Sequence, residues 1–439
     1  MSESDRSTDR IGVYSDSSIL KKVVLHRPGE ELLFNPDKSD DFLFDGPPII
    51  PKILEEYDEF VRLIEVFGSE IFFFEDMLIH VLDNNKDLRE QLLEDLVKDE
   101  WMKLDGKESD FLINKINTKD FVGFIISGYY PASRKGPKMD PTTNLMFTRD
   151  PMAVVGNNLL WTWHRPKRNR RKESFLVDLV IRYHPAFSDL KDIGSSTMND
   201  PSIMIEGGDI MVANENLLMI GFCRNQRQTR TTYNGIKHLA KHIIPDGFSI
   251  LLVEFTRHHT KNTIHMDTIG TFASDDYFFA DRRIFEQPTG TQSGVGLFLI
   301  DKDNLGELIE PSSKENDWPP GRISDRNFFE VIEPFGLKPE PIYTDDCEGK
   351  FGGLIPMREQ WMLAMNNFAL GPNKVIAYEY SIFTLKVAKE EGFTILPSTE
   401  IKERQDFYNH RKLIVTIPAT ELLRTRGGPH CLSMPLERE

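Results

Sequence analysis

Side chains capable of chemistry occur in five separate segments, and the first, NLMFTRDP (144–151), could bind a planar cation. Asp150 stands directly before Pro151, a position that disfavours helical backbone, so its carboxylate is expected at a turn. Phe147 lies three residues earlier. A guanidinium group suits this pair because cation–π attraction and a bidentate carboxylate contact act together. The competing interpretation is that Asp150 pairs with Arg149 or caps the turn.

The second segment, IEGGD (205–209), combines carboxylates with two glycines. Gly207 and Gly208 have no side chains, so a ligand could approach the backbone beside Glu206 or Asp209. A tight structural turn explains the same pattern equally well.

The third segment, HMDT (265–268), places an imidazole two residues from a carboxylate. On an extended segment His265 and Asp267 would point to the same face and could serve as a proton shuttle and a cation receptor. A lone histidine is more often structural, but the paired aspartate favours a catalytic role.

The fourth segment, RTRGGPHCLSMP (424–435), surrounds Cys431 with basic residues. Arg424, Arg426 and His430 are expected to favour the reactive thiolate. A buried inert cysteine is the ordinary alternative, although a polar, glycine-rich loop is an unusual place for one.

The fifth feature is a supply of arginines in polar segments, of which Arg170 and Arg230 could each hold a substrate carboxylate. Such arginines are usually only solvated. Taken together, the segments predict a nucleophile, an acid/base and several carboxylates around one cation: Cys431, His265, Asp150, Glu206 and Asp267, with Phe147 as an aromatic platform.

Composition limits the classes of protein that this chain can be. It has 439 residues, 39% of them hydrophobic, which is enough for a large globular core. The formal net charge of −16 makes nucleic acid an unlikely partner. We expect no membrane span or signal peptide and a cytoplasmic location. Three scattered cysteines do not make a disulfide framework: Cys223, Cys347 and Cys431.

The hydrophobic pattern predicts an α/β or α+β domain in which short strands alternate with helices. Strands are expected at 21–29, 70–74, 159–163, 202–205, 216–222, 249–255, 296–300, 374–380 and 412–418, and helices at 51–67, 174–182, 234–243 and 381–391. The basic run 167–172 is interpreted as a solvated loop. Residues 75–136 are charged and leucine-rich, which predicts an inserted helical subdomain between catalytic parts 1–74 and 137–439.

The ordered motifs FTRDP, EGGD, HMDT and the C-terminal CLSMPL (431–436) resemble the arginine deiminase family of guanidine-modifying enzymes. The likeness runs over most of the chain, from GVYSDSSILKKVVLHRPG (12–29) through REQW (358–361) to CLSMPL (431–436). It implies a pentein fold, a pseudo-fivefold propeller of ββαβ units around a central site, with a helical insertion. It also implies no metal and no organic cofactor.

The resemblance further implies a role for each matching residue. Cys431 would attack the guanidinium carbon, Asp150 and Asp267 would grip its nitrogens, His265 would protonate the leaving ammonia and then activate water, and Glu206 would orient His265. The substrate carboxylate would be held by Asn144, Arg170 and Arg230, with Arg171, Arg224 and Arg227 as alternative arginines. Arg426 matches a family arginine beside the nucleophile.

The sequence therefore predicts hydrolysis of arginine to citrulline and ammonia, with arginine as the small-molecule partner. Assembly into a homo-oligomer is left open. Other guanidine-modifying activities are amidinotransfer and hydrolysis of methylarginine or agmatine, and Asn144 with two arginines argues against agmatine. A hydrolase with a metal on Glu206, His265, Asp267 and Cys431 has only one histidine and mixed ligands. A noncatalytic arginine-binding protein would not need the thiol.

Overall fold

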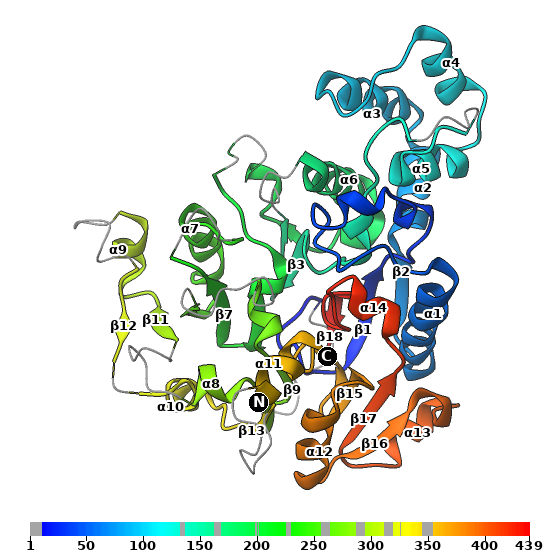
Figure 1. Ribbon diagram of the computed structural model, residues 1–439. Coiled ribbons are helices and arrows are strands. Elements are labelled where there is room, and N and C mark those ends of the chain that lie inside the picture. Colours follow the sequence, from blue (N-terminus) through cyan, green and yellow to red (C-terminus); the bar gives the residue numbers. More distant parts are fainter. Residues whose placement is uncertain are drawn as a thin grey trace, which may run out of the picture.

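The computed structural model describes residues 11–131, 137–161, 168–197, 200, 202–224, 230–255, 264–286, 295–310, 319–324, 326–344 and 354–439. Within these residues the strands form five separate sheets. The sheets are arranged around a common centre, with helices on their outer side (Figure 1). The chain is therefore a mixed α/β structure with a fivefold arrangement, as the sequence predicts.

One local pattern recurs in all five sheets: two antiparallel strands are followed by a helical crossover and a strand parallel to the second. A parallel partner requires such a crossover, because a short hairpin turn can only reverse the chain. Three units show the pattern simply: β3 (Met152–Val155), β4 (Asn158–Trp161), α6 (Arg168–Tyr183) and β5 (Lys191–Asp192); β6 (Ile210–Asn214), β7 (Leu217–Phe222), α7 (Tyr233–Ile243) and β8 (Ser249–Glu254); and β18 (Met434–Arg438), β1 (Leu20–Leu25), α1 (Ile50–Phe67) and β2 (Glu70–Phe73).

The other two units are elaborated. In one, β9 (Gly270–Ser274) and β10 (Tyr277–Ala280) pair, and a long connection leads to β13 (Glu340–Tyr343), which is parallel to β10. The connection contains α8 (Arg282–Phe285), β11 (Gly296–Ile300), α9 (Leu305–Ile309), β12 (Arg322–Ile323) and α10 (Phe328–Ile332). Its strands β11 and β12 extend the β6-β7-β8 sheet. In the other, β14 (Phe368–Gly371) and β15 (Lys374–Tyr378) are followed by α12 (Ile382–Glu390), β16 (Thr394–Pro397), α13 (Arg404–Tyr408) and β17 (Leu413–Ile417), in the order β14-β15-β17-β16. Both ends of the chain share one sheet, because β18 pairs with β1.

Most predicted elements are confirmed within a few residues, and three predictions are wrong. Residues 202–205 form no strand, because Met204 is hydrogen-bonded instead to Thr232 at the start of α7. The basic run is not a loop, since α6 begins at Arg168. Phe74 belongs to a helix rather than to the preceding strand.

In its described residues the segment predicted as a helical insertion contains four helices and no strand: α2 (Phe74–Asn84), α3 (Lys86–Lys98), α4 (Gly106–Asn114) and α5 (Thr118–Ser127). Helices α3 and α4 lie at the outer edge of the molecule (Figure 1). The buried leucines of α3 join the same hydrophobic cluster as β3 and β4, so the helices are packed onto the sheets. That residues 75–136 form a separate subdomain remains a prediction. No helix in the described part of the chain has the length and apolar character that crossing a membrane requires.

Candidate active site

The segment before the first strand of each fivefold unit supplies a polar side chain to one central site. A first strand is buried and regular, so the turn leading into it is where the fold can present polar groups. The contributing residues are Asp150 before β3, Glu206 before β6, His265 and Asp267 before β9, Asn366 before β14, and His430 and Cys431 before β18. Their side chains are all at least nine-tenths buried. Residues far apart in sequence are therefore brought together by the repeat itself.

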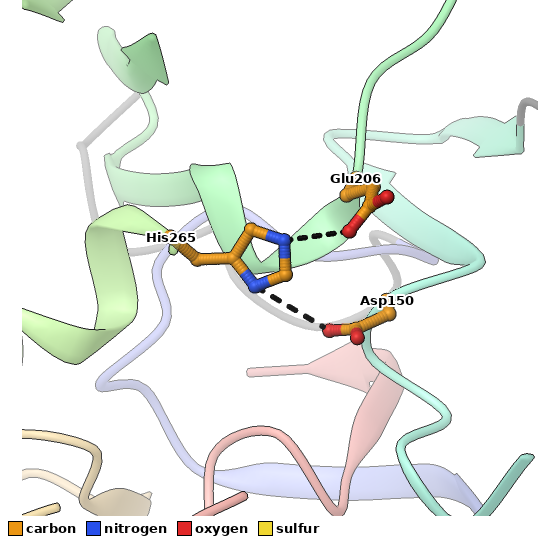
Figure 2. A group of neighbouring side chains, drawn as sticks. All are labelled: Asp150, Glu206 and His265. Carbon is orange, nitrogen blue, oxygen red and sulfur yellow. Dashed lines mark hydrogen bonds and ion pairs between the residues drawn. The ribbon is translucent and has the colours of Figure 1, made fainter. Parts of the chain in front are cut away.

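His265 lies between two carboxylates (Figure 2). Its Nε2 is 2.7 Å from Oε2 of Glu206, and its Nδ1 is 3.8 Å from Oδ1 of Asp150. A Cβ at Gly208 would lie 2.5 Å from Nδ1 of His265, so only glycine leaves room for the imidazole. The pair of glycines in EGGD is thus explained by close packing in the site.

The carboxylates control the charge of His265. Burial lowers the pKa of His265, but Asp150 and Glu206 outweigh it and raise the pKa to about 9. The imidazole therefore carries two protons near neutral pH and can act as an acid. Asp150, Glu206 and His265 are also close enough to hold a metal ion.

Cys431 is bonded to the second carboxylate of the site. Its Sγ donates to Oδ2 of Asp267 over 3.4 Å, and Nδ1 of His430 lies 2.9 Å from the same oxygen. The other oxygen of Asp267, Oδ1, has no hydrogen-bond partner among the described residues. Burial raises the pKa of Asp267, but His430 outweighs it and the pKa is lowered. Asp267 is thus a stable anion with one oxygen available to a cation.

The prediction that basic neighbours keep Cys431 as a thiolate is wrong for the ligand-free structure. Burial raises the pKa of Cys431 well above its ordinary value, and Asp267 and Asp150 raise it further. The expected cations are not free to oppose them, because Arg424 pairs with Glu421 and Arg426 pairs with Asp45. The backbone N of Arg149, the residue before Asp150, donates to the backbone O of Cys431 over 3.3 Å, so the loop that carries the thiol lies beside the segment that carries Asp150, the ion-pair partner of His265.

The sequence did not identify Asn366, whose side chain joins the backbone of Cys431 to the backbone of Asp267. Its Oδ1 accepts from the backbone N of Cys431, and its Nδ2 donates to the backbone O of Asp267, both over 3.1 Å. A Cβ at Gly428 would lie 2.5 Å from Oδ1 of Asn366. The only available signal was its place directly before an apolar strand, which it shares with the other site residues.

His265 and Asp267 do not lie on an extended segment, and that prediction is wrong. Residues Met266–Thr268 form a 3₁₀ turn. The turn directs His265 toward Glu206 and Asp267 toward Cys431, so the two side chains serve opposite sides of the site.

Phe147 lies against the loop that carries the thiol. A Cβ at Gly427 would be 1.9 Å from Cε1 of Phe147, so the ring packs directly on the backbone of Gly427. Tyr378 donates from its hydroxyl to O of Gly427 over 2.8 Å. Both contacts fix the start of the Cys431 loop, and Phe147 has the same buried surroundings as Cys431.

The residues expected to hold a substrate carboxylate have different partners in the structure. Asn144 is buried, and its backbone N donates to Oε1 of Glu173 over 3.2 Å. Arg230 bonds both oxygens of Glu206 at 3.1 Å. Arg224 is turned to Glu254. Arg170 lies in α6, and its side chain, like Arg171, is outside the described part of the structure, as is Arg227.

Arg426 lies at the edge of the site with a left-handed backbone, at φ 67°. Its Nε donates to Oδ1 of Asp45 over 2.7 Å, and its guanidinium carbon is 4.4 Å from the ring centroid of Trp361. A small pocket is lined by these three residues and by Ile264 and Thr268, the neighbours of His265 and Asp267. The pocket therefore adjoins the buried groups.

Comparison with known proteins gives one consistent result. The sequence model described as arginine deiminase matches residues 132–295 and 352–438, more than half of the chain. An arginine deiminase of Staphylococcus epidermidis is 26% identical, and one of Borreliella burgdorferi 29%, with 98% of each chain covered. The solved amidinotransferase from Microseira wollei has a TM-score of 0.50 and 13% identity over 98% of this chain and 97% of its own. The fold is thus the predicted pentein arrangement.

Proposed function

The chain belongs to the arginine deiminase family, and from this we propose that it hydrolyses arginine to citrulline and ammonia through a covalent intermediate on Cys431. The observation that carries the proposal is the thiol of Cys431 bonded to a buried carboxylate, Asp267, in the same site as the imidazolium of His265. A nucleophile, an acid and two anions are what guanidinium hydrolysis needs.

Recognition of the guanidinium is assigned to Asp150 and Asp267. Both are buried and face the thiol, and Asp267 keeps Oδ1 without a partner among the described residues. Carboxylates on two sides of a planar cation would hold it protonated, which keeps its carbon electrophilic. Phe147 would line the approach to the thiol.

Substrate binding also explains how a thiol with a raised pKa becomes a nucleophile. The carboxylates Asp267 and Asp150 both raise the pKa of Cys431, after burial itself. A guanidinium bound between them would cancel their charge and add a positive charge near the sulfur, so the thiol would lose its proton only when substrate is present. Substrate binding therefore converts the thiol of Cys431 into the thiolate nucleophile.

The reaction then has two halves that balance. The thiol of Cys431 releases its proton to solvent when the guanidinium binds, and the thiolate attacks the guanidinium carbon. His265 donates its proton to one amino group, which leaves as ammonia and gives an S-alkylthiouronium. The neutral His265 next takes a proton from water, and the hydroxide adds to the same carbon. The C–S bond breaks, the sulfur regains a proton, and citrulline is released. Glu206 would keep the ring of His265 in place at 2.7 Å.

The preference for arginine is assigned to Asn144, Arg170 and Arg230, which would hold the α-carboxylate. In the ligand-free structure Arg230 is engaged by Glu206, so it would have to share or exchange this contact. Arg426, beside the pocket that adjoins the site, is assigned to the substrate-binding surface as well. No step of this scheme requires a metal or an organic cofactor.

A citrulline and ammonia assay with arginine, agmatine and methylarginine tests the proposal. We expect equal amounts of citrulline and ammonia from arginine, with Cys431→Ser inactive and still folded by circular dichroism. Cys223→Ser is the matched control, because Cys223 is also a buried free cysteine but lies at the end of β7, outside the site. Full activity of Cys431→Ser, or a strong preference for agmatine, would contradict the proposal.

A further inference from the structure

A second cavity lies between helices α3 and α6, and none of the active-site residues lines it. Its volume is about 200 Å³. A buried cavity of about 150 Å³ is enough to hold a benzene molecule, so this one can take a ligand of six or seven heavy atoms. The residues that line the cavity determine which ligand it can bind.

Each helix presents one continuous face to the cavity. On α3 the lining residues include Leu88, Leu92 and Asp95, at successive turns. On α6 the apolar part comes from Phe175 and Leu179, again one turn apart. The floor is therefore hydrocarbon, suited to the apolar body of a ligand.

The charged residues of the lining are Asp95, Asp178 and Arg182, so the lining carries one net negative charge. Asp178 is buried, and its charge is balanced by an ion pair with Arg182 one turn along α6. Asp95 is different: its side chain is half-buried, and no described residue forms a hydrogen bond or ion pair with it. Burial raises the pKa of Asp95, and Lys98 opposes this only in part. A carboxylate without an ion-pair partner at the edge of an apolar floor offers a contact to a cation.

We propose that the cavity between α3 and α6 is a binding site for a small organic monocation, an ammonium group on a short hydrocarbon body. The ammonium would pair with Asp95, and the hydrocarbon would lie on Leu92, Phe175 and Leu179. An anion would be repelled by Asp95, since Arg182 is already paired with Asp178, and a neutral molecule would leave Asp95 unpaired. The site is separate from the arginine site, and the proposal does not rest on the catalytic scheme.

Titration calorimetry with n-pentylammonium tests this, with pentan-1-ol and pentanoate as neutral and anionic probes of the same length. We expect saturable binding of n-pentylammonium only, weakened about tenfold or more in Asp95→Asn, as loss of a charge-assisted contact implies. Glu94→Gln is the matched control, since it removes an exposed charge from the same helix. Leu179→Trp, which fills the cavity and leaves Asp95 in place, should also remove binding.

Three results would overturn the proposal. The first is binding of pentan-1-ol as tight as that of n-pentylammonium, which would make the site merely apolar. The second is unchanged binding in both Asp95→Asn and Leu179→Trp. The third is displacement of n-pentylammonium by arginine with no effect of Asp95→Asn, which would place the probe in the active site.

Discussion

The thiol of Cys431 and the carboxylate of Asp267 are joined by a hydrogen bond of 3.4 Å from Sγ to Oδ2. The nucleophile and one proposed cation receptor are thus in direct contact, and the anion raises the pKa of the thiol. Without substrate the contact holds the sulfur protonated. With a guanidinium on Asp267 the same contact would deliver the substrate carbon to the sulfur.

Replacing Asp267 by asparagine should separate these two effects. The pKa of Cys431 should fall because one of its neighbouring anions is lost, so alkylation by iodoacetamide at pH 8 should be faster without substrate. The value of kcat/KM for arginine should fall about a hundredfold or more, because a contact to the cation is lost. Alkylation is measured by mass spectrometry at Cys431, with Cys431→Ser as the background. Slower alkylation together with lost turnover would show that Asp267 activates the thiol instead.

Activity should decline as the pH rises through about 9, the raised pKa of His265. Burial lowers this pKa, but Asp150 and Glu206 outweigh it, so the proton needed by the leaving ammonia is present below that pH and absent above it. Replacement by glutamine should lower kcat by a factor of about 10² to 10⁴. The kcat/KM profile for arginine from pH 6 to 10 is the measurement, because kcat/KM reports the pKa values of the free enzyme. A profile that falls near pH 6.5 would contradict the assignment.

The same shift predicts a pH-dependent stability. The pKa of His265 is higher in the folded protein, about 9, than in the unfolded chain, about 6.5, so its contribution is fully present below pH 6.5 and is lost as the pH rises through 9. A difference of this size corresponds to about 3 kcal/mol. Urea unfolding of the wild type should show this loss across pH 6.5 to 9, and His265→Gln should lack it. Equal pH slopes in both proteins would contradict the prediction.

The sequence predicts the central strands well because β7, β8, β15 and β17 are apolar runs that the fold buries. It misses first strands such as β9 (Gly270–Ser274), since a short buried strand that starts with glycine carries little pattern of its own. The fivefold arrangement came from the resemblance, because the units share geometry and not residues.

The candidate site shows a similar limit. Cys431, His265 and the acidic residues were found because their chemistry is distinctive. The charge of the thiol was not predictable, because its raised pKa depends first on burial and then on Asp267 and Asp150, which only folding brings near the sulfur. Arg426, an expected cation, is turned to Asp45. Asn366 was missed because an amide without a motif looks like any loop residue; only folding places it between Cys431 and Asp267.

Asn366→Ala should leave the substrate receptors in place and lose the alignment of the thiol. Two hydrogen bonds of 3.1 Å disappear, one to the backbone of Cys431 and one to that of Asp267. We expect kcat to fall about 10- to 100-fold with a much smaller change in KM, and the free energy of unfolding to fall by about 1 to 3 kcal/mol. Asn367→Ala is the control, because Asn367 is also buried but donates only to Ala364. Equal losses of kcat in both variants would argue against a positioning role.

The imidazole of His265 packs directly against the backbone of Gly208. Gly208→Ala adds a Cβ that would lie 2.5 Å from Nδ1 of His265, closer than two such atoms can approach, so the ring must move away from Glu206 and Asp150. The value of kcat should fall about a hundredfold or more, since a general acid acts only within hydrogen-bond reach. Gly123→Ala is the control, because nothing lies within 4 Å of its Cβ position in α5, and it should keep full activity. If Gly208→Ala were as active as Gly123→Ala, the ring would not need its observed place, and the role given to His265 would have to be withdrawn.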